Sequence, residues 1–182
     1  ILTLKKTKLF KKIVVSTDSN SITKISKIYG ADIIIKRPKN LCKNNVTTIR
    51  VIKHAIRSLK KIKIHSNFFC CMYPAAPNTY FKNISLAYKI IQKNKLFVFP
   101  CVTKKNLKTK LQTVKSINKK KINHIFNDAG QFYFASKKTW LKSKKIIKKK
   151  SIIITLSEND SVDINTHKDF LKSKKIFKKK NE

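Results

Sequence analysis

The chain has 182 residues, a formal net charge of +36 and a hydrophobic fraction of 41%. This length suits one domain with a full core, and the hydrophobic fraction excludes a disordered chain. No apolar run approaches the roughly 20 residues that span a bilayer, and no signal-peptide segment opens the sequence. We therefore expect a soluble, cytoplasmic protein with no membrane partner.

The positive charge first suggests a nucleic-acid partner. However, three of the 44 basic residues are Arg (Arg37, Arg50 and Arg57) and the other 41 are Lys. Nucleic-acid-binding proteins favour Arg for bidentate and stacked contacts, and this chain does not interleave Arg with aromatic residues. Lys, Asn, Ile and Phe, which all have AT-rich codons, make up 93 of the 182 residues. Base composition therefore explains the charge, and no specific nucleic-acid partner is predicted.

The first half of the chain alternates short apolar runs with amphipathic segments. The apolar runs at 12–17, 31–36 and 67–73 predict strands. Apolar residues at helical spacing predict helices over 20–30 and 47–61; Ser19 or Asn20 caps the first of these, and Gly30 ends it. The adjacent Cys70 and Cys71 would face opposite sides of a strand, and the four cysteines have no metal-ligand spacing, so we expect reduced thiols.

The second half continues the alternation. We expect strands at 96–102, 131–136 and 151–156, and helices over 80–93, near 137–143 and over 166–178. The lysine-dense segment 104–123 is predicted to be a helix or a surface excursion. Strands that alternate with helices and lack in–out alternation are typical of a parallel sheet covered on both faces. The sequence therefore predicts one α/β domain over residues 1–182, with a site outside the carboxyl ends of its strands.

The stretch "HIFNDAGQFYF", residues 124–134, differs from the lysine- and isoleucine-rich sequence around it. It contains Gly130, one of only two glycines, beside an acid, an amide and three aromatic residues. On a strand, Gln131 and Tyr133 share one face, while Phe132 and Phe134 share the other. Only one of these pairs can line a site. From these residues alone, the favoured interpretation is an ordinary strand with core aromatic residues after a tight turn.

Six segments together resemble a known family. "VVSTDS", "RPKNL", "TTIRVIKHAI", "CCMYPAAP", "NDAGQFYF" and "VDINTHKDF" occur in an order and spacing similar to the cytidylyltransferases of nonulosonic acids. "DAGQFYF" and "YPAAP" resemble the pseudaminic acid branch. The resemblance implies a Rossmann-like, mostly parallel sheet lacking its first strand. It implies CTP and a nonulosonic acid as substrates, Mg²⁺ as cofactor, CMP-sugar and pyrophosphate as products, and allows a homodimer.

The same resemblance assigns site residues. On the nucleotide side it implies that Arg37 binds CTP, that Thr48 lies near the cytosine and that Asp18 has a structural or nucleotide-side role; a guanidinium also suits phosphate oxygens. On the sugar side it implies Tyr73, Gln131, Phe132 and Tyr133. The family's metal-binding Asp-x-Asp corresponds to Asp163 and Asn165, so the second ligand here is an uncharged amide.

The chain also departs from the family. The family's glycine- and basic-rich phosphate loop has no counterpart, and an acid of the loop after Leu41 is Asn44. We therefore expect these 182 residues alone to be inactive. Three hypotheses remain open: a cytidylyltransferase whose amino-terminal part is not in this sequence, a non-catalytic remnant of one, or a lysine-rich nucleic-acid-binding module.

Overall fold

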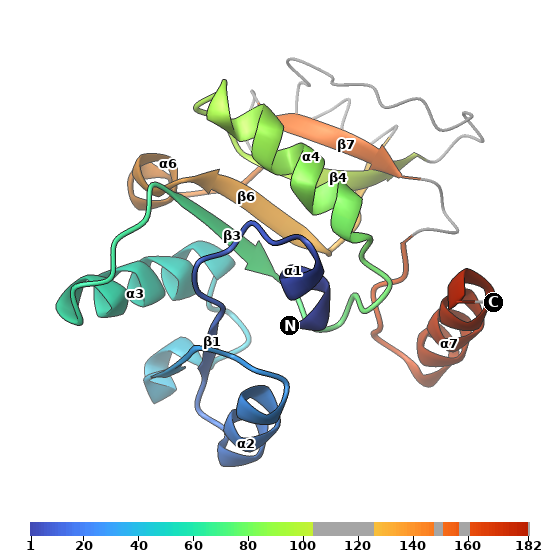
Figure 1. Cartoon of the computed structure of the whole chain (residues 1–182), viewed down its shortest axis with the longest axis horizontal. Coiled ribbons are helices and arrows are strands. Elements are labelled where there is room, and N and C mark those ends of the chain that lie inside the picture. The colour runs from blue at the N-terminus through green and yellow to red at the C-terminus, as the bar shows by residue number, and fades with distance from the viewer. Residues whose placement is uncertain (104–125, 148–150, 157–160, 182) are drawn as a thin grey trace.

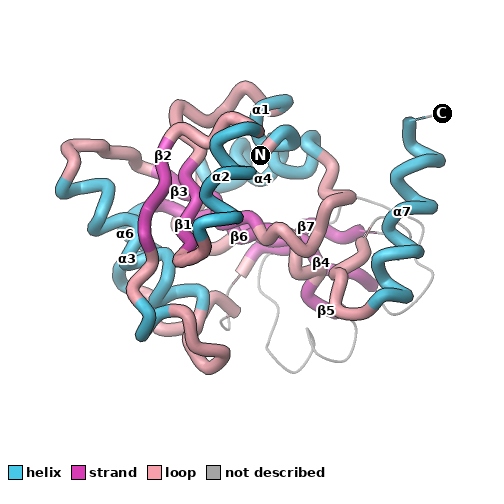
Figure 2. The backbone as a smooth tube through the Cα atoms, turned by 90° about the horizontal axis from the view of Figure 1, so that it is seen from below, coloured by secondary structure: helices cyan, strands magenta, loops and turns pink. Residues whose placement is uncertain are grey.

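The computed structural model describes residues 1–103, 126–147, 151–156 and 161–181. The segment 104–123, expected to be a helix or a surface excursion, lies outside the described residues. Within the described chain the strands form a two-stranded sheet and a five-stranded sheet. Figure 2 shows the small sheet, with β1 (Val14–Thr17) and β2 (Ile33–Lys36), on the side of the molecule away from the last helix, α7 (His167–Asn181).

The small sheet is a β–α–β unit that follows a short helix, α1 (Leu2–Lys6). Strands β1 (Val14–Thr17) and β2 (Ile33–Lys36) pair in parallel, and α2 (Asn20–Ile28) connects them. The start of α2 is capped as predicted, because the Ser19 hydroxyl accepts a hydrogen bond from the Ile22 amide at 3.3 Å. Gly30 ends the turn after the helix with a φ of +82°, which favours glycine.

The larger sheet is built around β4 (Val98–Thr103). One end of β4 pairs with β6 (Phe132–Ser136) and the other with β5 (Phe126–Asp128), both antiparallel. On its other edge β4 pairs in parallel with β7 (Ile152–Leu156), since Val98 has partners in both β6 and β7. Strand β3 (Phe68–Met72) pairs antiparallel with β6 along its whole length.

The expected single, mostly parallel sheet is therefore wrong. In the larger sheet one pairing is parallel and three are antiparallel, and β1 and β2 pair only with each other among the described strands. The physical reason is that β6, a strand from late in the chain, lies between β3 and β4 and runs against both. Without it, the β–α–β alternation from β3 to β4 would give the parallel pair that the sequence suggested.

Helices cover both faces of the larger sheet (Figure 1). Helices α3 (Thr48–Lys61) and α6 (Lys137–Lys142) pack on one face, where the buried cluster includes Ile56, Phe99 and Trp140. Helix α4 (Phe81–Gln92) packs on the other face against a cluster that includes Phe132 and Phe134. The prediction of a sheet covered on both faces is thus confirmed for the larger sheet.

The last helix, α7 (His167–Asn181), lies apart from the larger sheet in Figure 1. Its start carries a capping box: the Asp169 amide donates to the Thr166 hydroxyl, and the Asp169 carboxylate accepts from the Thr166 amide at 2.9 Å. The Asn78 side chain donates to the Ser173 carbonyl at 3.1 Å and fixes the middle of the helix. Among the described helices, none has the length and apolar character required to cross a membrane.

Candidate functional site

Two tyrosines form the centre of the candidate site. Tyr73 follows β3, and its amide donates to the Gln131 carbonyl at 2.9 Å, which joins the end of β3 to the start of β6. The rings of Tyr73 and Tyr133 meet edge to face, with centroids 5.6 Å apart. The Tyr73 hydroxyl hydrogen-bonds to Oγ1 of Thr48 at the first turn of α3. The pair therefore connects the end of β3, β6 and the start of α3.

Asp128 anchors the second tyrosine. The Tyr133 hydroxyl donates to Oδ2 of Asp128 at 2.5 Å, and the Gly130 amide donates to Oδ1 at 3.1 Å. Asp128 ends β5, where its backbone pairs with Cys101 of β4. The β4–β5 pairing therefore fixes the carboxylate at the point where the chain turns from β5 into β6.

Gly130 brings a second carboxylate to this turn. Its φ is +60°, and a Cβ at this position would lie 3.1 Å from Oδ2 of Asp163. The segment that carries Asp163 is tied to the "YPAAP" turn, because the Ile164 amide donates to the Ala75 carbonyl at 2.9 Å. Asp163 and Asp128 therefore lie on either side of a glycine that has no side chain to separate them.

The charges of the site follow from this packing. Partial removal from solvent raises the pKa of Asp128, and the negative charge of Asp163 adds to this, while the hydrogen bonds from Tyr133 and Gly130 act against it. Burial raises the pKa of Tyr133 and of Tyr73. Both phenols are therefore neutral at physiological pH and act as hydrogen-bond donors or acceptors.

The structure separates the predicted sugar-side residues as strand alternation requires. Tyr133 lies in the cluster beneath α3 and α6, whereas Phe132 lies in the cluster beneath α4 and is 0% exposed. A ligand at Tyr73 cannot reach Phe132 through the sheet, so we leave Phe132 out of the site. Gln131 is only 1% exposed, so it lies in the interior rather than on an open surface.

The three predicted nucleotide-side residues do not lie together. Thr48 touches the tyrosine pair through Tyr73. Arg37 follows β2 and crosses the end of β1, where its Nε donates to Oγ of Ser16 at 3.2 Å and its Nη2 to the Ser16 carbonyl at 2.5 Å. Asp18 is exposed just after β1. The guanidinium is thus held by backbone and side chain of β1 and would have to leave Ser16 to bind a phosphate with the same nitrogens.

The donor set at Asp163 can be compared with the needs of Mg²⁺. Asp163 and Asn165 are both exposed, and Nδ2 of Asn165 lies 3.2 Å from Oδ2 of Asp163. One carboxylate and one amide oxygen are ligand types that a hard cation accepts, provided that the Asn165 amide turns its oxygen toward the ion. No cluster of three or more His, Cys, Asp or Glu residues occurs in the described part of the chain. The residues therefore fit a cation that takes its other ligands from water and substrate.

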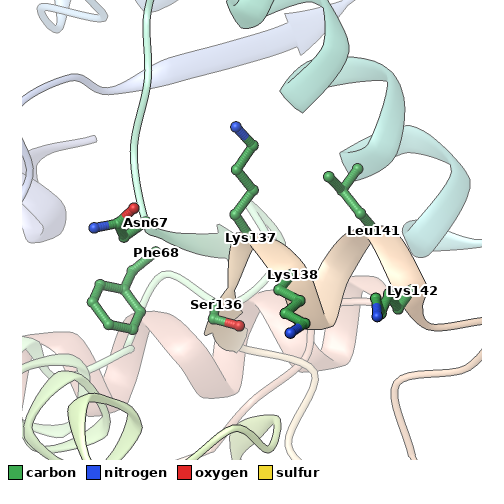
Figure 3. A pocket seen from close by; sticks show the side chains of 7 residues that line it. All are labelled: Asn67, Phe68, Ser136, Lys137, Lys138, Leu141 and Lys142. Atoms are coloured by element: carbon green, nitrogen blue, oxygen red, sulfur yellow. The ribbon is translucent and has the colours of Figure 1, made fainter.

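A shallow pocket of about 600 Å³ lies elsewhere. Figure 3 shows it at the start of β3 and the end of β6, the opposite end of the β3–β6 pair from Tyr73, with Lys137 and Lys138 pointing in different directions. Its lining consists of Asn67, Phe68, Ser136, Lys137, Lys138, Leu141 and Lys142. These side chains supply amines and apolar contacts but no carboxylate, so the candidate site remains at the tyrosine pair.

Comparison with solved structures defines the class of fold. A structure of CMP:2-keto-3-deoxy-manno-octonic acid synthetase complexed with CTP superposes on 96% of this chain and on 86% of the synthetase chain, with a TM-score of 0.61 and 7% sequence identity. For the 4-diphosphocytidyl-2C-methyl-D-erythritol synthase of Anaerococcus prevotii, the superposition covers 97% of this chain and 85% of the synthase chain, with a TM-score of 0.63 and 15% sequence identity. The chain has the α/β fold of these nucleotidyltransferases. No family model matches it.

Curated relatives narrow the class. A Helicobacter pylori protein named pseudaminic acid cytidylyltransferase and UDP-2,4-diacetamido-2,4,6-trideoxy-beta-L-altropyranose hydrolase is 32% identical over 96 residues, 52% of this chain and 18% of that protein. The pseudaminic acid cytidylyltransferase of Campylobacter jejuni is 27% identical over 147 residues, 71% of this chain and 62% of the enzyme. The chain is thus a homologue of pseudaminic acid cytidylyltransferases, as its motifs indicated, and it spans less than two thirds of these relatives.

The sequence interpretation did not single out Asp128 as a site residue. Its contacts depend on the pairing of β5 with β4, and β5 has only three residues, too few to show a period. The available signal was an acid two residues before a glycine and five before a tyrosine, in a chain with eight acidic residues.

Proposed function

We propose that this chain forms the sugar-acid side of an enzyme that transfers CMP from CTP to a nonulosonic acid, with pseudaminic acid as the preferred substrate and pyrophosphate as the second product. The supporting observation is that Thr48, Tyr73, Tyr133 and Asp163 come together at one end of the larger sheet from four separate segments. The homology to pseudaminic acid cytidylyltransferases supports the same assignment.

In this proposal the sugar acid lies against the exposed side of Tyr73. Tyr73 is half-buried, whereas Tyr133 is only 6% exposed and supports the Tyr73 ring from its buried side at an interplanar angle of 73°, so Tyr73 supplies the apolar surface for N-acyl methyl groups. The attacking hydroxyl of the sugar would face the α-phosphate of CTP. Gln131 supports the position of Tyr73, because its carbonyl accepts a hydrogen bond from the Tyr73 amide.

The nucleotide would lie toward α3 and β1. Thr48 opens α3, where free backbone amides favour a negative ligand. Arg37 supplies a guanidinium, and Asp18 marks the same strand ends. Asp163 and Asn165 would hold Mg²⁺, which neutralises phosphate charge when bound.

One part of the chemistry is not supplied by these residues. Nucleotidyl transfer depends chiefly on positioning and charge stabilisation of the phosphates. The chain has two glycines, and each lies in an isolated turn rather than a glycine-rich loop. Scattered flexible lysines do not preorganise a triphosphate. We therefore expect chain 1–182 to bind the sugar acid, to bind CTP weakly with no preference over ATP, and to form no CMP-sugar.

The test uses two forms of the protein. Calorimetric titration of chain 1–182 with pseudaminic acid, CTP and ATP measures binding. The same chain extended at its amino terminus by a glycine-rich phosphate loop is assayed for pyrophosphate release, which should require CTP, pseudaminic acid and Mg²⁺ together. Equal turnover with a simple hexose phosphate would refute the sugar-acid assignment. No turnover by the extended chain, with binding of the sugar acid retained, would identify a non-catalytic remnant.

A further inference from the structure

We propose that Asp128 is a positioning residue for the sugar-acid site: it holds the Tyr133 ring, and through it the Tyr73–Thr48 contact, in the orientation that receives the substrate. This inference rests on the proposed function, which does not itself assign a role to Asp128. The geometry of the hydrogen bonds around Asp128 supports it.

First, the Asp128 carboxylate joins the two parts of the turn between β5 and β6. One oxygen accepts from the Gly130 amide and the other from the Tyr133 hydroxyl. A carboxylate suits this task because it offers only acceptors, and both partners are donors. Hydrogen bonds to a charged acceptor are about twice as strong as neutral ones. The backbone turn and the tyrosine side chain are therefore fixed by one group.

Second, the Tyr133 ring packs in the buried cluster beneath α3 and α6 and meets Phe99 at 5.7 Å and Tyr73 at 5.6 Å between centroids. These apolar and ring contacts contain no hydrogen bond, so they do not fix the position of the hydroxyl. The hydrogen bond to Asp128 fixes the hydroxyl end of the ring and so sets the angle at which Tyr133 supports Tyr73.

Third, the fixed ring transmits the constraint to the nucleotide side. Tyr73 rests edge to face on Tyr133, and its hydroxyl bonds to Thr48 at the start of α3. A tilt of Tyr133 would therefore move the Tyr73 ring away from Thr48. Asp128 itself stays beside the site, so it acts through Tyr133 rather than through the reacting atoms.

A double-mutant cycle tests this role. The affinity of chain 1–182 for pseudaminic acid is measured by calorimetry for Asp128→Ala, Tyr133→Phe and the double variant. We expect each single change to weaken binding about tenfold, the loss of roughly one hydrogen bond's free energy. The double variant should bind no worse than either single one, because both remove the same interaction. Losses that multiply in the double variant would overturn the inference.

Further variants separate positioning from stability. Asp128→Asn should restore binding to within about twofold, because its amide oxygen can accept from Gly130 and its amide nitrogen can donate to the tyrosine oxygen. Asp32→Asn is the matched control: its carboxylate also accepts a backbone amide, that of Ile13 at 2.7 Å, but in the small sheet. It should leave affinity unchanged. If Asp128→Ala does not fold, Tyr133→Phe and Asp128→Asn still decide the question, and full affinity in Tyr133→Phe would overturn it.

The outcome also distinguishes the inference from the function beneath it. An unaltered chain that fails to bind pseudaminic acid overturns the proposed function, and the positioning role falls with it. An unaltered chain that binds, while Asp128→Ala binds equally well, overturns the positioning role alone.

Discussion

Replacing Gly130 with alanine should disturb the site more than it disturbs the fold. The backbone at Gly130 has a φ of +60°, and the left-handed region costs an L-residue roughly 1–2 kcal/mol. The new Cβ would also lie 3.1 Å from Oδ2 and 3.2 Å from Cγ of Asp163. Asp163 is exposed and can rotate away, so this contact adds little to the loss of stability. The effect of the new contact is to move the Asp163 carboxylate out of its position in the site.

The free energy of unfolding should therefore fall by about 1–2 kcal/mol, which for a chain of this length lowers Tm by roughly 2–8 °C. Thermal unfolding followed by circular dichroism measures this. In the amino-terminally extended form, the Mg²⁺ concentration for half-maximal pyrophosphate release should rise, because Asp163 is one of the two expected ligands.

Gly30→Ala is the matched control. Gly30 also has a positive φ, +82°, and a Cβ there would meet the flexible end of Lys5 rather than a site residue. It should lower Tm by a similar amount and leave the Mg²⁺ requirement unchanged. If Gly130→Ala and Gly30→Ala had the same Mg²⁺ requirement, Asp163 would not be at the cation and the reasoning would fail.

Three other changes give distinct expected results. Asn165→Asp in the extended form should lower the Mg²⁺ requirement by adding a charged ligand; an unchanged or higher requirement would show that Asn165 is not at the metal. The hydrogen bond from the Ile13 amide lowers the pKa of Asp32, so Asp32 stabilises the fold above the ordinary Asp pKa, and this contribution is lost as pH falls through its lowered value. As the pH falls below about 4, the Asp32→Asn variant should therefore lose less free energy of unfolding than the unaltered chain does, as measured by urea unfolding. Equal losses would exclude this role. Trp140→Ala should reduce the free energy of unfolding by about 3–5 kcal/mol, because Trp140 is fully buried and its indole donates to the Phe69 carbonyl at 3.0 Å; a loss below 1 kcal/mol would contradict that packing.

The sequence predicted the elements better than their pairing. Ile49 and Ile56 recur at helical spacing and form the buried side of α3, and Gly30 ends the turn after α2 as expected. Helix α1 and strand β5 were missed because five and three residues are too short to show a period. The antiparallel position of β6 was missed for another reason. A strand buried on both faces shows no alternation whether its neighbours are parallel or antiparallel, so its sequence does not reveal its direction.

In the candidate site, too, features set by one segment were predicted, and features set by the pairing of segments were missed. Strand alternation correctly separated Phe132 from Tyr133, because that depends only on the geometry of one strand. The roles of Asp128 and Arg37 depend on which segments meet in space. The Tyr133 hydroxyl reaches Asp128 across a turn, and Arg37 reaches Ser16, which lies 21 residues earlier in the sequence. No spacing rule within a single segment contains that information.

The division into two sheets also bears on how the protein opens locally. Strands β1 and β2 pair only with each other in the described part of the chain, whereas β4 has partners on both edges. Ile22, Ile25 and Ile28 of α2 are exposed, so the small unit buries little apolar surface. Backbone amides of residues 14–36 should therefore exchange with deuterium long before those of β4, in a sub-global opening that leaves the larger sheet intact. Arg37 belongs to the unit that opens, and Tyr73 and Tyr133 to the part that stays closed. The two halves of the expected substrate site would thus have different lifetimes in the absence of ligand, and a nucleotide that bridged them would slow exchange in the first unit selectively.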